Sequence, residues 1–134
     1  MSADLLFTRV DVTQVGQTAK YTMRVLPDKV GVQQKIVIGD ESGALACFGL
    51  KKGDLDSRFR TLPSGTPISR VELGGPSKGS KDAIFFASGH NIAGISRKGR
   101  EFFKFETTLT EPIRNLVVEG QNIYCSGDYS FYHF

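Results

Sequence analysis

The stretch GALACFGLKKGDLDSRFRT (residues 43–61) decides the fold, because several of its residues recur at the same spacing in GHNIAGISRKGREFFKFET (residues 89–107). Four features recur 46 positions later, 89 minus 43 for the first pair. They are Gly43 and Gly89, Lys52-Gly53 and Lys98-Gly99, Phe59 and Phe105, and Thr61 and Thr107. Beyond this stretch, Pro67-Ile68 returns as Pro112-Ile113. A period of about 40–50 residues made of short strands is typical of a β-propeller blade.

The rest of the chain has the same character. Short β-rich runs alternate with turn residues, and no long window carries a helical apolar period free of Gly and Pro. The sequence therefore predicts an all-β protein of about three four-stranded antiparallel blades. We expect one incomplete β-propeller domain over residues 1–134, with an N-terminal strand at 5–12, blade one at 21–62, blade two at 68–107 and a partial blade three at 113–134.

The number of blades is too small for a closed ring. A single blade cannot bury both faces of its sheet, so neighbouring blades must stack. Seven blades of about 45 residues need roughly 315 residues, and this chain has 134. Because an open stack leaves sheet edges unpaired, we expect a fragment of a larger, seven-bladed propeller, or a chain that self-associates.

Groups that could perform catalysis or bind a metal are scattered. Two of the glycines in residues 74–81 have the separation of those in a phosphate loop, but Ser80-Lys81 stands where that loop needs Lys before Ser or Thr, and a strand follows. The soft metal ligands match no zinc spacing: Cys47, His90, Cys125 and His133. We predict that the protein is not an enzyme, with no catalytic or metal site and no cofactor.

Other reactive side chains have ordinary structural interpretations. The acidic residues Asp40 and Glu41 fall in an expected turn, where solvated carboxylates are usual. Cys47 and Cys125 lie in apolar runs, which favours buried, reduced thiols and a cytoplasmic location. Residues 1–12 are too short and too polar for a secretory signal.

The charge pattern supplies a candidate binding surface. The net charge is +3, and in a propeller the first and third turns of each blade share one face. This face collects the candidate basic interaction residues Lys51, Lys52, Lys78, Lys81, Arg97, Lys98 and Arg100. Such a face suits an anionic surface, either a phosphoinositide membrane or an acidic protein.

Two other classes of protein stay open. The runs Phe85-Phe86 and Phe102-Phe103 could stack on single-stranded nucleic acid, but packing between blades accounts for them, and no nucleic acid is expected. A small lipid-binding β-barrel of ten strands would also be all-β and rich in Phe. Such a barrel needs near-uniform alternation of apolar and polar residues, and the 46-residue repeat argues against it.

Four segments resemble one known family. They are Val37-Ile38-Gly39-Asp40, ACFGLKKG (46–53), RVELGG (70–75) and FETTLTE (105–111). The segments are similar, in order and spacing, to the N-terminal β-propeller of the seventh Bardet–Biedl syndrome protein family. The resemblance runs from about Leu6 to Tyr132, and its most specific part joins Ile38-Gly39-Asp40 to the CFGLKKG block.

The resemblance implies a non-catalytic scaffold of the BBSome, the coat complex that carries membrane proteins into and out of cilia. It implies contacts with other BBSome subunits, especially the second. It also implies a location in the cytoplasm and at the cilium and basal body, peripheral to the ciliary membrane. In this family the complex meets anionic lipid mainly through other subunits.

Overall fold

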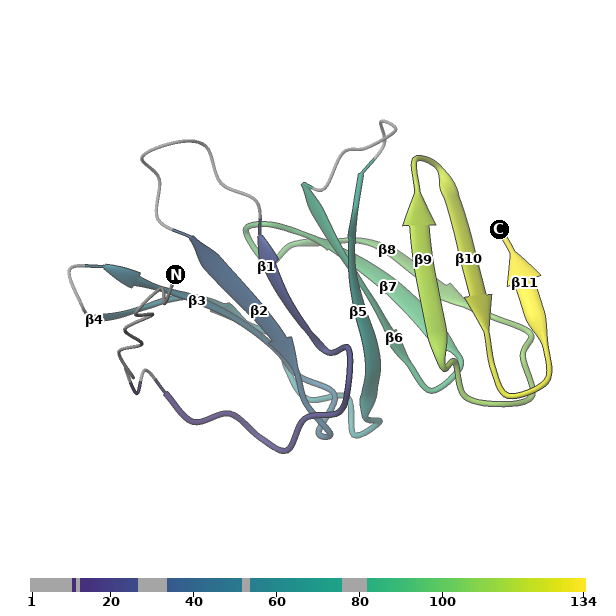
Figure 1. Cartoon of the computed structure of the whole chain (residues 1–134), viewed down its shortest axis with the longest axis horizontal. Coiled ribbons are helices and arrows are strands. Elements are labelled where there is room, and N and C mark those ends of the chain that lie inside the picture. Colours follow the sequence, from purple (N-terminus) through teal and green to yellow (C-terminus); the bar gives the residue numbers. More distant parts are fainter. Residues whose placement is uncertain (1–10, 12, 27–33, 52–53, 76–81) are drawn as a thin grey trace, which may run out of the picture.

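The computed structural model describes residues 11, 13–26, 34–51, 54–75 and 82–134. These residues form eleven strands in three antiparallel sheets that stand side by side (Figure 1). Within the described ranges there is no helix long and apolar enough to cross a membrane. The expected strand at 5–12 falls outside the described residues, apart from Asp11.

Each sheet runs in chain order from one edge to the other. Blade one contains β1 (Met23–Leu26), β2 (Lys35–Gly39), β3 (Leu45–Lys51) and β4 (Asp54–Arg60). Blade two contains β5 (Ile68–Gly74), β6 (Ala83–Ser88), β7 (Asn91–Ser96) and β8 (Glu101–Glu106). Blade three contains β9 (Asn115–Glu119), β10 (Asn122–Ser126) and β11 (Phe131–His133).

The three sheets confirm the predicted fold class of an all-β, partial propeller. Each is an up-and-down meander, and the first strands of the blades approach one another, β1 with β5 and β5 with β9. No sheet closes on itself in the described part of the chain. The interpretation of the sequence as a small lipid-binding barrel is therefore wrong.

The 46-residue repeat corresponds to equivalent backbone contacts. After β4, the amide of Thr61 donates to the carbonyl of Leu45 at 2.8 Å, and after β8 the amide of Thr107 donates to His90 at 3.0 Å. The amides of Ile68 and Ile113 likewise donate back to the preceding blade, to Asp40 (3.0 Å) and Gly89 (2.7 Å). These bonds fasten the start of each new blade to the blade before it.

The core lies in two layers between the blades. The cluster between blades one and two, the first interface, consists of Leu26, Val37, Leu45, Cys47, Ile68, Val71, Ile84 and Ile95. The cluster between blades two and three, the second interface, consists of Ala83, Phe85, Ala87, Ile92, Leu109, Ile113, Leu116, Ile123 and Cys125. Burial of this apolar surface is the main force that holds the blades together.

The middle strand β6 explains why aromatic residues stand next to each other in the sequence. Successive side chains on a strand point to opposite faces. Phe85 therefore belongs to the second interface, while Phe86 packs against the first. Packing between blades is confirmed for both rings, although Phe102 is 56% exposed.

Polar contacts join the first strands of blades one and two. Arg24 on β1 donates from Nε to the carbonyl of Val71 at 2.9 Å and forms an ion pair with Glu72. Glu72 also pairs with Arg70, 3.2 Å from Nε to Oε1. The Arg70 guanidinium lies 4.3 Å from the ring centroid of Tyr21, a cation–π contact. These residues satisfy one another and bridge β1 and β5.

Candidate functional site

The structure describes only part of the predicted basic face. The side chains of Lys51, Lys52, Lys78 and Lys81 lie outside what it describes. Arg97, Lys98 and Arg100 are described and belong to one feature, the turn between β7 and β8. The whole face therefore stays a prediction, and the geometry can be built for its blade-two part.

Hydrogen bonds hold the β7–β8 turn in one shape. The hydroxyl of Ser96 accepts from the amides of Lys98 (3.3 Å) and Arg100 (3.2 Å). The amide of Gly99 donates to the Ser96 carbonyl at 2.9 Å. Gly99 has a φ of 91°, a conformation that residues with a Cβ rarely adopt. The turn thus presents its cations from a fixed backbone.

A close contact presses this turn against blade one. A Cβ built on Gly99 would lie 2.7 Å from the Phe59 ring, so only a glycine lets the turn approach this closely. Phe59 itself packs on the apolar core of the first interface. As a result, Arg97 and Lys98 are brought to the edge of the gap between blades one and two.

Two cations that the sequence analysis did not assign join them there. Lys35 begins β2, Arg58 lies on β4, and both line a hollow of about 490 Å³ with Ser57, Arg97 and Lys98. Arg58 forms an ion pair with Asp56 (3.7 Å), and Arg97 forms one with Asp82 (3.9 Å). The missed signal was that Lys35 stands two residues before the buried Val37 and so faces the same way.

Burial and three of the cations that line the hollow influence the pKa of the Cys47 thiol. Cys47 is a free thiol with 1% exposure. Burial raises the pKa of Cys47, and the positive charges of Lys35, Arg58 and Arg97 oppose that rise. Cys125 is also free and buried, and burial raises its pKa. The expectation of buried, reduced thiols is confirmed for both.

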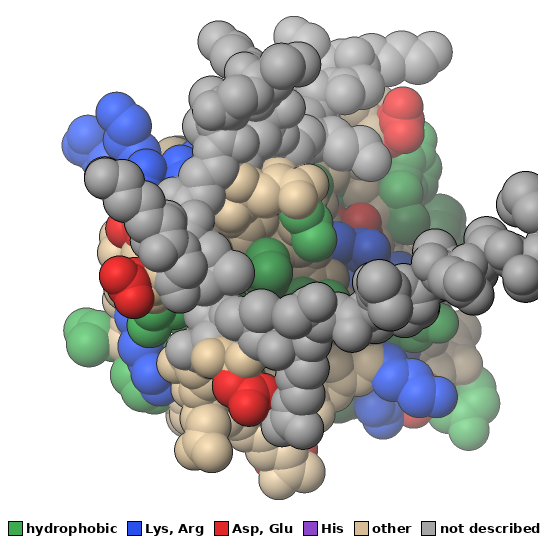
Figure 2. Space-filling model, turned by 60° about the vertical axis from the view of Figure 1, so that its left-hand side comes forward, with side chains coloured by type: hydrophobic (Ala, Val, Ile, Leu, Met, Phe, Trp, Pro, Cys, Tyr) green, Lys and Arg blue, Asp and Glu red, His purple; other side chains and the backbone are tan. Residues whose placement is uncertain are grey.

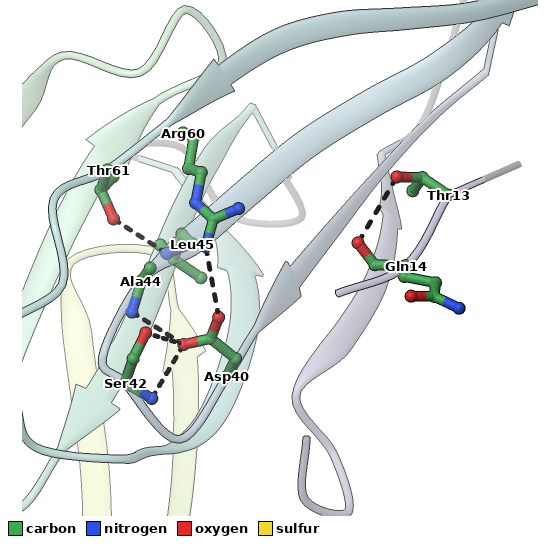
Figure 3. A network of polar contacts seen from close by, with 8 residues as sticks. All are labelled: Thr13, Gln14, Asp40, Ser42, Ala44, Leu45, Arg60 and Thr61. Carbon is green, nitrogen blue, oxygen red and sulfur yellow. Dashed lines mark hydrogen bonds and ion pairs between the residues drawn. The ribbon is translucent and has the colours of Figure 1, made fainter. Parts of the chain in front are cut away.

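Asp40 is the functional-looking carboxylate that the sequence analysis placed wrongly. It was expected in solvent, but it is 6% exposed, and its carboxylate contacts Ser42, Ala44 and Arg60 (Figure 3). Its Oδ1 accepts from the Ser42 amide at 3.0 Å, the Ser42 hydroxyl at 2.6 Å and the Ala44 amide at 3.1 Å. Its Oδ2 lies 4.0 Å from Arg60. The carboxylate therefore organises the β2–β3 turn.

The protonation of Asp40 follows from these contacts. Burial alone would raise its pKa, but the hydrogen bonds from Ser42 and Ala44, with the charge of Arg60, hold the pKa below its ordinary value. The main-chain carbonyl of Asp40 accepts from Ile68, the first residue of β5. Asp40 is thus a structural residue that ties the turn of blade one to blade two.

Other reactive groups do not assemble into a site. Among the described residues, no three His, Cys, Asp or Glu side chains come together in a way that could hold a metal ion. His90 contacts Glu106 at 3.2 Å, and His133 contacts Asn122 at 2.9 Å. The basic hollow is the arrangement with a clear chemical preference, which is for anions.

Comparisons with known proteins agree with the architecture. A sequence model of the family described as BBS7 beta-propeller matches residues 23–134. The chain is 42% identical to a Mus musculus protein, BBSome complex member BBS7, over 132 residues. It is 40% identical to a Caenorhabditis elegans protein, BBSome complex member bbs-7, over 131 residues. These alignments cover 98% and 95% of this chain, and 18% of each relative.

Proposed function

Because this chain belongs to the BBS7 β-propeller family, we propose that it is a non-catalytic scaffold domain of a BBSome subunit. The observation that carries the proposal is the family match over residues 23–134, on a chain whose described part folds as stacked blades. A stack of sheets with turns on both rims offers broad surfaces for other proteins, which suits assembly better than small-molecule turnover. The proposed role is in ciliary membrane-protein trafficking.

The partners follow from the relatives, which are named as members of the BBSome complex. We expect this chain to contact other BBSome subunits, the second in particular. The corresponding location is the cytoplasm, cilium and basal body, peripheral to the ciliary membrane. The chain spans 18% of the length of each relative, so these roles concern the domain as part of an assembly.

Capture of the complex tests this role. The complete gene product, tagged and expressed in ciliated cells, is expected to co-purify with other BBSome subunits and to sediment with them as one complex. A product that folds but sediments alone would refute the scaffold role.

The blades are proposed to belong to one incomplete propeller, with the limits 21–62, 68–107 and 113–134 and an additional strand at 5–12. Exposed apolar side chains such as Phe131, at 67% exposure, support further packing partners for the outer faces. Self-association of the isolated chain is the expected consequence. Sedimentation as a compact monomer at high concentration would count against it.

The basic face is proposed to meet an anionic surface, a phosphoinositide-bearing membrane reached through the complex. Its support is the fixed β7–β8 turn and the two cations that blade one adds beside it. Charge reversal of Lys51, Lys52, Lys98 and Arg100 to Glu is expected to abolish binding to acidic vesicles and its salt dependence. Unchanged binding by that variant would refute the role of this face.

A further inference from the structure

We propose that the hollow between blades one and two is a binding site for a compact polyphosphate, an anion with at least two phosphate groups such as a phosphorylated inositol ring. This inference rests on the proposed basic face and gives that face a ligand. It differs in kind, because a membrane can lie against exposed lysines, whereas a hollow accepts a discrete molecule.

The charge around the hollow is the first argument. Four cations from three separate segments, β2, β4 and the β7–β8 turn, line the same space. They are Lys35, Arg58, Arg97 and Lys98. Lys35 and Lys98 take part in no ion pair within the described ranges. Ion pairs with Asp56 (3.7 Å) and Asp82 (3.9 Å) engage only the two arginines, so the lining of the hollow is positively charged and attracts anions.

The chemistry of the donors favours phosphate. A guanidinium offers paired N–H donors that match two phosphate oxygens, and an ammonium adds a point charge with three donors. Arg58 and Arg97 stand on opposite blades, and each is matched by a lysine on its own blade. Ser57 also lines the hollow. One phosphate group cannot engage both blades as fully as two groups on one ring can.

The size of the hollow is consistent with this class of ligand. Its volume of about 490 Å³ lies within the range of about 300–1,000 Å³ that small-molecule sites occupy. Single ions need far less space. The walls are held by elements that the fold fixes: the β7–β8 turn is locked by Ser96, and Gly99 is pressed on Phe59.

Arg58 reaches this space because of an irregularity in blade one. The ladder between β3 and β4 shifts register between Cys47 and Phe48, and Arg58 has no partner in it. A β-bulge of this kind re-aims a side chain. Arg58, freed from the ladder in this way, lines the hollow together with Lys35 and Arg97.

The described cations on the blade-one side of the molecule form separate groups. Figure 2 brings this side forward and shows Lys and Arg side chains in several places among hydrophobic and acidic ones. The convergence of four cations on one hollow is what distinguishes this part of the surface.

Titration with a soluble polyphosphate tests the proposal. The complete gene product, with the subunits that co-purify, is titrated calorimetrically with inositol trisphosphate and separately with inorganic phosphate. We expect saturable one-to-one binding of the trisphosphate and binding of inorganic phosphate that is weaker by about 10-fold or more, since each lost charged contact is worth about a factor of ten.

Variants that replace lysines of the hollow by uncharged glutamines test the location of the site. Lys35→Gln with Lys98→Gln is expected to weaken trisphosphate binding by about 10-fold or more. The matched control, Lys20→Gln with Lys104→Gln, removes two exposed cations elsewhere and is expected to change binding by less than about twofold. Absence of trisphosphate binding, or equal loss in both double variants, would overturn the proposal.

A vesicle arm distinguishes the source of the phosphates. The vesicles contain phosphatidylcholine with phosphatidylinositol bisphosphate. If they bind and the binding depends on Lys35 and Lys98, the ligand is a lipid headgroup. If the trisphosphate binds and the vesicles do not, the ligand is a soluble molecule. A third outcome would reject the hollow as a binding site but leave the basic face as a membrane-binding surface. In that outcome the trisphosphate does not bind, and the Lys35/Lys98 variant still binds vesicles. Failure of the scaffold role would instead appear in the wild-type protein, as a loss of co-purifying subunits.

Discussion

The fourth strands of blades one and two differ at one repeated position, because their register shifts fall at different places. Ser57 on β4 and Phe103 on β8 are 46 positions apart, and each stands two residues before the repeated Phe59 or Phe105. Phe103 packs on the second interface and lies 6.3 Å from Phe85 between ring centroids. The shift in blade one places Phe59 opposite the buried Cys47 but Ser57 opposite Phe48, so Ser57 lies on the other face of the sheet.

The repeated phenylalanines two residues later pack in both blades. Phe59 packs beside the first core, while Phe105 contacts Phe134 of blade three with 4.6 Å between ring centroids. Both fourth strands break register with the strand before them, β4 at Arg58 and β8 at Phe102. The position of the irregularity therefore decides whether the repeated position joins the core, as Phe103 does, or leaves it, as Ser57 does.

The largest effect is expected where the interfaces are alike. Ile68 and Ile113 are equivalent and almost fully buried, at 1% and 0% exposure. Replacing either by Ala removes buried methylene groups and leaves a cavity, which should lower the free energy of unfolding by about 2–5 kcal/mol. Urea denaturation of each variant measures this. A loss confined to one of the two would contradict the equivalence of the interfaces.

Exchanging the differing position should give unequal results. Phe103→Ser opens an aromatic cluster and is expected to lower the free energy of unfolding by roughly 2–3 kcal/mol, less than for a fully buried ring. Ser57→Phe adds a ring to an exposed position outside the first core and should change the free energy of unfolding by less than about 1 kcal/mol. Thermal unfolding of both variants measures the asymmetry. Equal destabilisation would mean that Ser57 faces the first core as Phe103 faces the second.

Asp40 provides a test of the turn that joins blade one to blade two. Asp40→Ala removes three hydrogen bonds to one carboxylate oxygen and should lower the free energy of unfolding by about 1–3 kcal/mol. Because its folded pKa is lowered, this stabilisation is complete above the ordinary Asp pKa of about 3.9. It should be lost as the pH falls through the folded pKa.

A pH series of denaturation curves measures this contribution. Asp40→Asn is the control, because it keeps a carbonyl acceptor but cannot titrate. Its stability is expected to depend less on pH in the acid range than that of the wild type. An identical acid dependence would show that Asp40 does not stabilise the folded state through its charge.

The smallest effect is expected at the corresponding turn of blade three. Glu111 Oε1 accepts from the amides of Tyr129 and Ser130, both at 2.8 Å. The bond from Tyr129 is the main reason why the pKa of Glu111 is lowered, so its contribution is also lost in acid. The site is open to solvent, and Glu111→Gln should change the melting temperature less than Asp40→Ala does. A larger change would reverse this ranking of the two turns.

The sequence was sufficient for the repeat and its consequences. Gly43/Gly89, Phe59/Phe105 and Thr61/Thr107 predicted blades of short strands, and the structure places each pair in equivalent positions. Such features are local: a turn needs a glycine, and a strand with two apolar neighbours needs two apolar faces. Because these requirements concern neighbours along the chain, they appear in the sequence as particular residue types at regular spacings.

The candidate site was only partly predictable. Arg97, Lys98 and Arg100 could be assigned because they follow one another in a turn that the glycine marks. Lys35 and Arg58 could not, since one looks like an ordinary strand start and the other depends on a bulge. Asp40 was misjudged because its type and position in a turn do not reveal that Gly16 and Arg60 lie against it.

By itself, then, the sequence determined the blade period, the all-β class, the buried thiols and the family. Only the tertiary structure decided that cations from β2, β4 and the β7–β8 turn share one hollow and that Asp40 is enclosed. The physical reason is that strand pairing and turns depend on neighbours along the chain. Burial and the gathering of charge depend on how one whole sheet packs against the next, through Phe59 on Gly99 and the register shift that frees Arg58 from the ladder.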